Sequence, residues 1–279
     1  MLRIIASLFR VTRFWNLVII AIAQYFTVYF LVSPQNISDW HLAVLTLSTL
    51  MIAAAGYIIN DYYDVKIDLI NRPDRVVVGK TIPRRYALLM HTLLSFAGTA
   101  AGFVVGWEIG VINFISAFLL WWYSNSLKRQ PFVGNLCVAF LTALSIFVIP
   151  FLYRDANIMF ILIYGAFAFI ATLLREIIKD IEDLKGDNTF GCRTLPIVWG
   201  VRRTKNLIYT LTAAFLALVV SLHIVIEPLP MNYFVIFLFA PLLWVVIQTA
   251  RADTKRDFGT LSLVCKVIML LGVFSMALL

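Results

Sequence analysis

Long runs of apolar residues, separated by short polar stretches, dominate this chain. A helix of about 20 apolar residues is long enough to cross the hydrocarbon core of a bilayer. That rule predicts nine membrane-spanning helices, at residues 14–32, 42–59, 86–106, 109–127, 132–152, 157–178, 206–226, 232–250 and 261–279. We therefore expect an all-α protein that crosses the membrane about nine times.

The polar stretches between these runs alternate in charge. One set is basic and comprises the N-terminus and residues 60–85, 128–129, 175–205 and 251–256. The other set is short, has Arg154 as its one basic residue, and comprises residues 33–41, 107–108, 153–156 and 227–231. Because basic loops are retained in the cytoplasm, we expect the N-terminus inside and the C-terminus outside, in a cell (inner) membrane.

Composition supports a membrane protein and argues against a soluble domain. Of the 279 residues, 62% are hydrophobic and 14% are charged, whereas a soluble domain has about 25% charged residues. The net charge of +8 is explained by basic cytoplasmic loops, so we expect no nucleic-acid partner. Cys137, Cys192 and Cys265 lack metal-ligand spacing, so we expect neither a zinc site nor a disulfide.

Two acidic triplets share the spacing D-x2-D-x3-D. They are Asp61, Asp64 and Asp68 in NDYYDVKID, and Asp180, Asp183 and Asp187 in KDIEDLKGD. Positions i, i+3 and i+7 share one helix face, and carboxylates held together require a compensating cation. Mg²⁺ is bound by a few carboxylates and completed by water and substrate phosphates. The pattern favours a magnesium-bound diphosphate at the membrane; the alternative is a solvated helix end paired with Lys66, Lys179 and Lys185.

The positions of the triplets suggest an internal repeat. Each triplet follows a span that is expected to run from outside to inside, and four spans separate the two. Spans one to four and five to eight are therefore predicted to form two four-helix pseudo-repeats. The alternative is coincidence of spacing, since the remainder of the two halves has no obvious sequence identity.

Polar residues near the triplets are candidates for binding the diphosphate. Pro73 predicts a loop that carries Arg72 and Arg75, whose guanidinium groups suit phosphate. After the second triplet, Gly186 and Gly191 predict a loop that carries Arg193. Tyr123 and Lys128 could reach a phosphate from the cytoplasmic rim. Asn60 could orient Asp61, Asn135 is a polar group that needs a partner in lipid, and Arg13 and Asn16 could face the same cavity. For the basic residues the alternative is an ordinary cytoplasmic loop charge, and for Arg13 and Asn16 it is an interfacial anchor or a helix contact.

These residues resemble the UbiA-type intramembrane prenyltransferases. NDYYDVKID matches the first family motif, NDxxDxxxD, at its four fixed positions, and Asp183 to Asp187 matches the second motif, DxxxD. The segment from Tyr123 to Lys128 is one residue longer than the family's YxxxK pattern, which puts the role of Lys128 in question. The flanking sequences INRPDR and REIIKDIEDLKGD are most similar to the archaeal-type branch, which attaches geranylgeranyl to geranylgeranylglyceryl phosphate.

The resemblance implies a single prenyltransferase domain over residues 1–279, with a ring of helices around a central cavity that cytoplasmic loops cap. It implies Mg²⁺ as cofactor, with metal ligands among Asn60, Asp61, Asp64, Asp68, Asp180, Asp183 and Asp187. Catalysis is assigned to Asp64, Asp68, Asp183 and Asp187, and diphosphate binding to Arg72, Arg75, Tyr123, Lys128, Arg193 and Asn16. The expected partners are a prenyl diphosphate, a lipophilic acceptor and membrane lipid, with no obligate protein partner.

Two other functions are compatible with parts of this pattern. An aromatic quinone precursor is the alternative acceptor for the same prenyl transfer. A cation transporter is the competitor from another class, because repeats with matched acidic sites suit a carrier. Against the carrier, the acidic residues cluster at helix ends, and we expect no Asp or Glu inside a span, where an ion path usually needs one.

Overall fold

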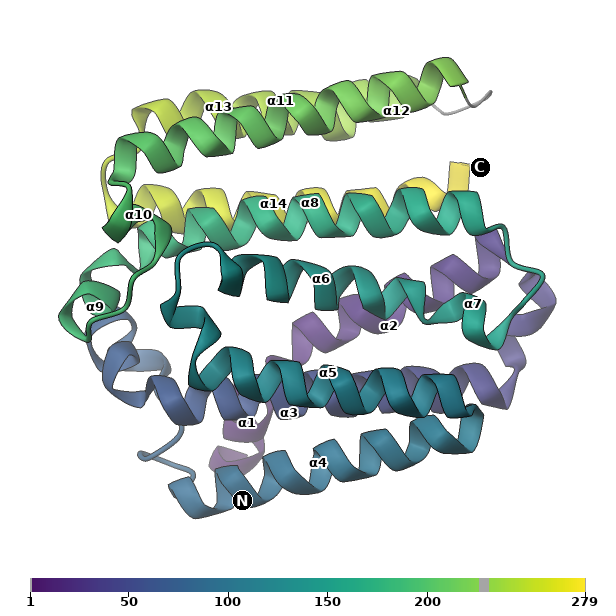
Figure 1. Cartoon of the computed structure of the whole chain (residues 1–279), viewed down its shortest axis with the longest axis horizontal. Coiled ribbons are helices and arrows are strands. Elements are labelled where there is room, and N and C mark those ends of the chain that lie inside the picture. Colours follow the sequence, from purple (N-terminus) through teal and green to yellow (C-terminus); the bar gives the residue numbers. More distant parts are fainter. Residues whose placement is uncertain (1, 226–230, 279) are drawn as a thin grey trace. The chain divides into compact units, whose positions relative to one another are not determined.

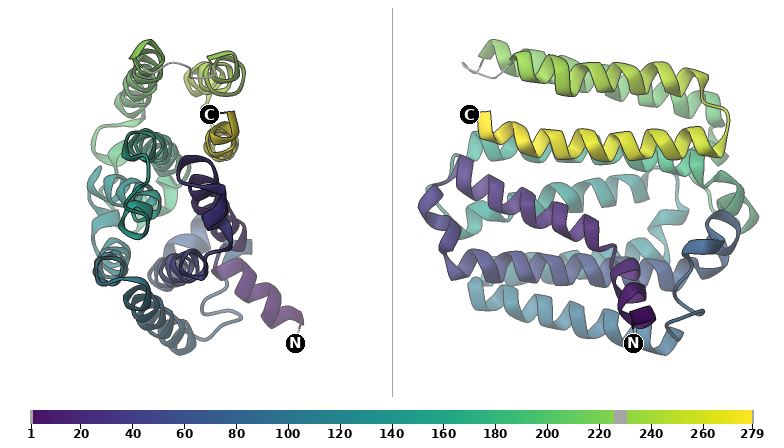
Figure 2. Two further views of the ribbon diagram at one scale, coloured as in Figure 1. Left: turned by 90° about the vertical axis from the view of Figure 1, so that its right-hand side faces the viewer. Right: turned by 180° about the vertical axis from the view of Figure 1, so that it is seen from behind.

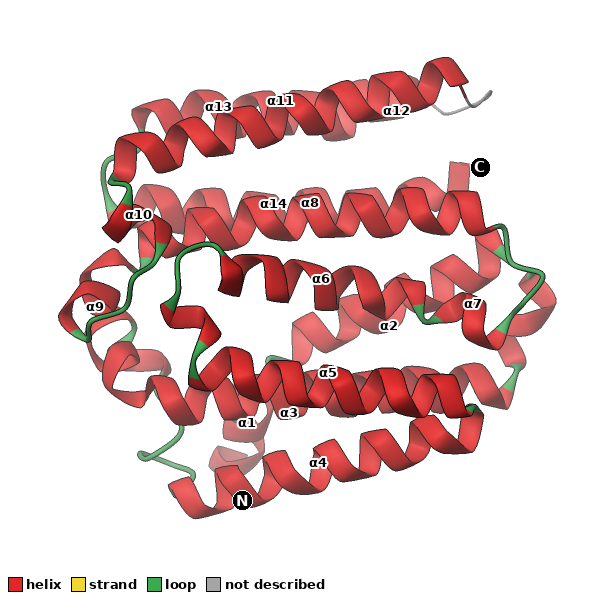
Figure 3. Cartoon of the chain, viewed as in Figure 1, coloured by secondary structure: helices red, strands yellow, loops and turns green. Residues whose placement is uncertain are grey.

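The computed structural model describes residues 2–225 and 231–278, and the regular structure over these residues is helical (Figure 3). Within them, one isolated bridge between Val78 and Ile82 is the only β-type pairing. The all-α fold is confirmed. The chain divides into two compact units, which are described separately: unit 1 is Met1–Lys128 with Ser145–Ile158, and unit 2 is Arg129–Leu144 with Met159–Leu279.

Unit 1 is built on three long helices, α3, α4 and α5, that pack against one another (Figure 1). Its elements are α1 (Leu2–Val11), α2 (Phe14–Leu31), η1 (Pro34–Ser38), α3 (Trp40–Asn71), η2 (Pro73–Arg75), α4 (Arg84–Val105), α5 (Trp107–Asn125), η3 (Leu127–Arg129) and α7 (Ile149–Leu152). Helices α3 and α4 approach closely because Gly98 has no side chain, and a Cβ there would lie 2.9 Å from Ile52. Asn113 of α5 donates hydrogen bonds to the Ser48 hydroxyl (2.9 Å) and to the Gly98 carbonyl (3.1 Å). These bonds join the three helices through polar groups in apolar surroundings.

Unit 2 is organised around α8, which lies beside α14 (Figures 1 and 2). Its elements are α6 (Val133–Phe147), α8 (Ile158–Glu182), α9 (Leu184–Thr189), α10 (Leu195–Val198), α11 (Val201–Val225), α12 (Met231–Phe234), η4 (Val235–Phe239), α13 (Ala240–Arg251), α14 (Lys255–Phe274) and η5 (Ser275–Leu278). The Tyr164 hydroxyl lies 3.0 Å from that of Ser275. Gly272 faces the Phe167 ring so closely that a Cβ would meet it at 2.1 Å. The core of the unit is formed by buried residues of α8 together with residues of α11, α13 and α14.

The helices match the apolar runs of the sequence. Seven helical segments in the described residues are long and apolar enough to cross a membrane, and each falls on one of the nine expected spans. At the other two expected spans lie α5 and the shorter apolar segment Val235–Arg251. Most of the loop expected at 227–231, residue 226 and Leu279 lie outside the described residues.

The unit boundary lies near the expected repeat boundary. The first switch between units follows Lys128, between the fourth and fifth expected spans. Residues 145–158, however, belong to unit 1. Most of α6 belongs to unit 2, whereas its last residues and α7 belong to unit 1. The units are therefore not two uninterrupted halves of the sequence.

Candidate functional site

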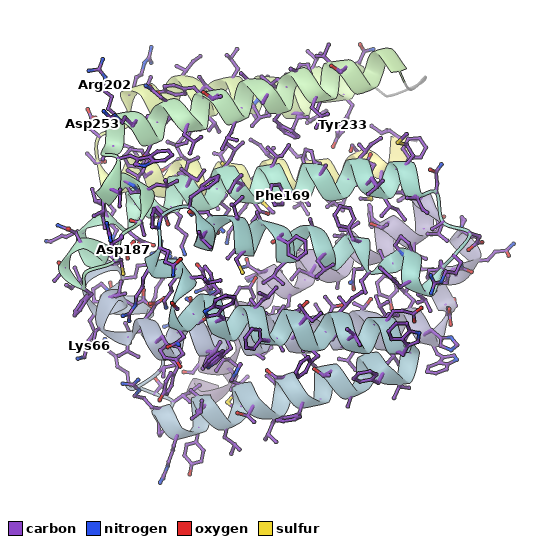
Figure 4. All side chains as sticks on the ribbon, viewed as in Figure 1. Lys66, Phe169, Asp187, Arg202, Tyr233 and Asp253 are labelled. Atoms are coloured by element: carbon purple, nitrogen blue, oxygen red, sulfur yellow. The ribbon has the colours of Figure 1, made fainter. Side chains whose placement is uncertain are left out.

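The first acidic motif lies on one uninterrupted helix. Asn60, Asp61, Asp64 and Asp68 all belong to α3, which continues to Asn71. The shared face predicted for the three aspartates is therefore present, and Figure 4 labels Lys66 on the same helix. A helix of 32 residues is longer than the bilayer requires, so its last turns can carry charges beyond the apolar segment.

Two cations from other parts of unit 1 pair with this motif. The Arg13 Nη2 atom lies 3.1 Å from Asp61 Oδ1, and the Lys128 Nζ atom lies 2.5 Å from Asp64 Oδ1. The Lys128 and Asp64 side chains are only 9% and 15% exposed. In such surroundings an ion pair is weakly screened by water. Lys128 is thus at the motif, despite the extra residue that separates it from Tyr123.

Arg13 reaches Asp61 from a break between two helices. It lies between α1 and α2 in the left-handed region (φ 51°, ψ 53°), a conformation that costs energy for any residue with a Cβ. The Arg13 guanidinium lies 4.8 Å from the centre of the Tyr57 ring. Asn16 donates a hydrogen bond of 3.4 Å to the Tyr57 hydroxyl. Asn16 therefore lies in the Arg13–Asp61 cluster, and it bonds to a tyrosine of that cluster.

The two arginines after the motif lie on a tight turn. Helix α3 ends before Pro73, as predicted, and the Arg72 N–H donates to the Asp68 carbonyl at 2.7 Å. Arg75 is exposed, and its N–H donates to the Arg72 carbonyl at 2.9 Å. The Lys80 ammonium closes the turn by donating to the Pro73 carbonyl at 2.8 Å. Tyr123, the remaining candidate in this unit, is half-buried near the end of α5.

The oxygen atoms of the first motif suit magnesium better than a metal that needs a complete protein cage. Asn60 Oδ1 is buried and has no hydrogen-bond partner, and Asn60 and Asp64, four residues apart, share a helix face. Among the described residues, no three His, Cys, Asp or Glu side chains are grouped closely enough to hold a metal. Mg²⁺ commonly takes one or two carboxylates and completes its shell with water and substrate phosphates. The residues present therefore fit an ion that arrives with a phosphorylated substrate.

The second acidic motif lies at a helix break in unit 2. Asp180 is in the last turn of α8, Asp183 separates α8 from α9 (φ −92°, ψ 3°), and Asp187 is in α9, where Figure 4 labels it. The predicted single helix face is therefore interrupted at Asp183. Two backbone hydrogen bonds, Asp183 N–H to the Lys179 carbonyl and Asp187 N–H to the Asp183 carbonyl, keep the turns in register.

Asn135 holds the first residue of this motif. Its amide Nδ2 donates to Asp180 Oδ2 at 2.9 Å. Asn135 lies near the start of α6 and is itself 7% exposed. A buried amide in an apolar helix needs a partner, and Asp180 is that partner. The hydrogen bond fixes the orientation of one carboxylate.

The loop after the second motif begins later than predicted. Gly186 lies inside α9, so the prediction of a loop there is wrong, while Gly191 takes φ +70° in the turn that follows. The Cys192 N–H donates to the Asp187 carbonyl at 2.9 Å, and the Arg193 N–H donates to the Arg129 carbonyl at 2.8 Å. The backbone of Arg193 is thus anchored, and its side chain is exposed.

Sequence reasoning missed two features of the site. Tyr57 was not a candidate, although it contacts both Arg13 and Asn16. Glu176 was not a candidate either, although it is buried on α8 next to Arg175. The spacing of Glu176 from Asp180, four residues earlier on the same helix, was the available signal.

The sequence is similar to those of known membrane enzymes. The profile of the UbiA prenyltransferase family matches residues 18–272. A digeranylgeranylglyceryl phosphate synthase from Methanosphaera stadtmanae is 32% identical over 250 residues, which is 86% of this chain and 88% of the relative. The enzyme of the same name from Saccharolobus solfataricus is 31% identical over 258 residues, covering 88% of this chain and 87% of the relative.

Solved structures agree with the fold. A digeranylgeranylglyceryl phosphate synthase structure superposes with a TM-score of 0.69 at 21% identity, covering 98% of this chain and 97% of that one. A UbiA homologue from Archaeoglobus fulgidus bound to GPP and Mg²⁺ superposes with a TM-score of 0.69 at 16% identity, covering 97% and 99%. At these identities the likeness establishes the arrangement of helices.

Proposed function

The chain belongs to the UbiA prenyltransferase family, and we propose that it transfers a geranylgeranyl group from its diphosphate to geranylgeranylglyceryl phosphate, forming an ether lipid. One observation carries the choice of acceptor: a relative named for this product matches 86% of the chain and 88% of its own length. The first motif supplies the oxygen ligands and the buried cation that a diphosphate-dependent reaction requires.

The enzyme is an integral membrane prenyltransferase, and we propose that residues 1–279 act as one domain. The family match supports this, since it extends through both compact units. The basic loops support a cytoplasmic N-terminus, an outer C-terminus and a reaction centre on the cytoplasmic side of a cell (inner) membrane. Donor and acceptor are both lipids and reach the enzyme from the bilayer.

We propose that Mg²⁺ is the cofactor. In the first unit Asn60, Asp61, Asp64 and Asp68 would hold the metal, and in the second unit Asp180, Asp183 and Asp187 would do so. The bound ion would neutralise charge that develops on the diphosphate leaving group. The structure of the A. fulgidus homologue with GPP and Mg²⁺ supports a metal in this family.

The remaining candidates act on the diphosphate oxygens or on the motif. Lys128 can donate to a phosphate oxygen, because its ammonium is already at Asp64 and is largely shielded from water. Arg72, Arg75 and Arg193 add cations on the loops that follow the two motifs, and Tyr123 adds a phenol donor near the end of α5. Asn16 acts through Tyr57, which places it beside Arg13.

Purified protein with Mg²⁺ and labelled geranylgeranyl diphosphate tests the proposal. The acceptors are geranylgeranylglyceryl phosphate and, separately, a hydroxybenzoate or a naphthoate. We expect magnesium-dependent label in the ether lipid. Label only in an aromatic acceptor would retain the family reaction and overturn the glyceryl acceptor. Absence of both products, with no release of diphosphate, would return the cation carrier to consideration.

A further inference from the structure

Helix α8 carries a polar face from the second acidic motif into its apolar segment. Thr172, Glu176 and Asp180 recur every four residues and so share one side of the helix. The opposite side packs into the core of unit 2 through Leu174, Ile177, Ile178 and Ile181. Glu176 lies seven residues before Asp183, about 10 Å along the helix, in the direction of the apolar segment.

Glu176 is a carboxylate in surroundings that disfavour charge. The residue is 8% exposed, and its Oε1 atom accepts a hydrogen bond from Arg175 Nη1. Ionisable residues in a membrane segment are costly and mark functional positions by default. A buried ion pair is weak evidence that its residues stabilise the fold. The position of Glu176 is therefore better explained by a role in function than by a role in stability.

The hydroxyl one turn before Glu176 lacks a partner. Three other buried threonines, Thr27, Thr212 and Thr249, donate to the carbonyl four residues earlier at 2.7–2.8 Å. Thr46 and Thr194 are buried without a partner, as Thr172 is. Thr172 is 3% exposed, and its Oγ1 atom has no hydrogen-bond partner. The Nε atom of Arg175 is also buried and unpaired. Buried polar groups are normally satisfied, so these two atoms could still bond to a polar group of a ligand beside Glu176.

We infer that Glu176 accepts the proton of the acceptor hydroxyl and that Thr172 orients this hydroxyl. The inference rests on the proposed function. With the diphosphate at the acidic motif, the prenyl carbon that reacts and the hydroxyl that attacks it lie toward the apolar segment of α8. Among the carboxylates of α8, Glu176 is the one nearest to that segment, one turn before Asp180.

The proposed step is balanced without a further reactant. The bond between the prenyl C1 carbon and its diphosphate oxygen breaks, and the electron pair leaves with the diphosphate. A lone pair of the acceptor hydroxyl forms the new carbon–oxygen bond, and the hydroxyl proton passes to the Glu176 carboxylate. An alcohol becomes a strong acid once its oxygen bonds to a cationic carbon, so even a carboxylate paired with Arg175 can take this proton.

Glu176→Gln tests the inference through the products formed. Without a proton acceptor, the newly formed bond reverts and water captures the prenyl cation instead. We expect ether formation to fall on the order of 100-fold, while donor consumption falls much less and prenyl alcohol becomes the main product. The shift in unfolding temperature caused by Mg²⁺ with a non-cleavable prenyl diphosphate analogue should be unchanged. Thr172→Val should raise the KM for the acceptor and leave that for the donor unchanged.

Glu182→Gln is the matched control, because Glu182 is on the same helix and on a different face. It should keep the wild-type ratio of ether to alcohol. If Glu176→Gln unfolds, Glu176→Ala with added formate replaces it, and ether formation restored by formate supports the inference. An unchanged product ratio, or an equal loss of ether and of donor consumption without formate rescue, overturns it. Failure of wild-type protein to transfer any prenyl group would instead refute the proposed function.

Discussion

The acidic motifs of the two units differ in what compensates their carboxylates. In unit 1, Asp61 and Asp64 pair with the cations Arg13 and Lys128, which come from distant parts of the chain. In unit 2, Asp180 accepts a hydrogen bond from the neutral amide of Asn135. The first motif lies on a continuous helix and the second at a helix break. Two motifs with the same spacing thus have different electrostatic environments.

This difference predicts different responses to a metal ion. At the first motif Mg²⁺ would compete with the Lys128 ammonium and the Arg13 guanidinium, so these cations would have to move for the metal to bind. A Lys128 ammonium displaced from Asp64 remains close enough to donate to the incoming diphosphate. At Asp180 the hydrogen-bond donor is a neutral amide, so metal binding would not have to displace a cation from this bond. The amide orients the carboxylate before a metal arrives.

The largest expected effect is from removal of one carboxylate in either motif. Asp64→Ala and Asp183→Ala should each reduce prenyl transfer on the order of 1000-fold or more, because the metal contributes several kcal/mol of charge stabilisation. Asp74→Ala, at an exposed position on the turn after α3, is the control and should transfer at the wild-type rate. Initial rates with saturating Mg²⁺ make the measurement. Near-normal turnover in either motif variant would refute the proposal that the reaction requires both motifs.

A smaller and more selective effect is expected from Lys128→Met. Removing one partner of a buried ion pair leaves the Asp64 charge uncompensated, which costs about 3 kcal/mol. The unfolding temperature in EDTA should therefore fall, and Mg²⁺ should raise it by more than it does for the wild type. Lys66→Met changes an exposed lysine on α3 and serves as the control. An equal response to Mg²⁺ in wild type and Lys128→Met would show that the ammonium and the metal do not compete.

Asn135→Leu examines the neutral arrangement of the second motif. It removes the donor to Asp180, so we expect about 1–2 kcal/mol of destabilisation and a loss of rate of about 10-fold. The extra stabilisation by Mg²⁺ that is expected for Lys128→Met should be absent, because no cation has been removed. Thermal unfolding with and without Mg²⁺, together with initial rates, measures both quantities. A response like that of Lys128→Met would remove the proposed difference between the motifs.

Local features of the sequence predicted most of the fold. The apolar runs located the helices, since a segment with so little charge favours lipid over water. Pro73 predicted the end of α3, because proline cannot continue the hydrogen-bonding pattern. The spacing of Asp61, Asp64 and Asp68 predicted a shared helix face, and their helix is unbroken.

Features that depend on distant contacts were not predictable. The ion pair of Arg13 with Asp61 joins residues 48 apart in sequence, and that of Lys128 with Asp64 joins residues 64 apart. Arg13 and Lys128 were candidates for the site, but their own neighbours in sequence do not indicate which aspartate each would pair with. The break at Asp183 occurs without proline or glycine at that position. Gly186 had the opposite outcome: a residue that favours loops lies within α9, because propensity is a weak guide next to tertiary context.

The smallest expected effect is on the unfolding temperature of Asp39→Asn. Asp39 precedes the first residue of α3 and, like Asp180, accepts hydrogen bonds. Burial by itself raises the pKa of Asp39, but bonds from the His41 backbone and ring and from the Tyr153 hydroxyl outweigh it and bring the pKa below its ordinary value of 3.8. A depressed carboxyl pKa stabilises the fold above the unfolded-state value and loses that contribution as pH falls through the folded-state value. Asp39→Asn keeps an oxygen that can cap α3 and loses the charge. The advantage of wild type in unfolding temperature should therefore be present at pH 6 and shrink at about pH 3.5. If the unfolding temperatures of wild type and Asp39→Asn change in parallel with pH, the charge of Asp39 does not stabilise the fold. A carboxylate held by these hydrogen-bond donors would then differ from Asp64, whose charge is expected to stabilise the fold through its ion pair with Lys128.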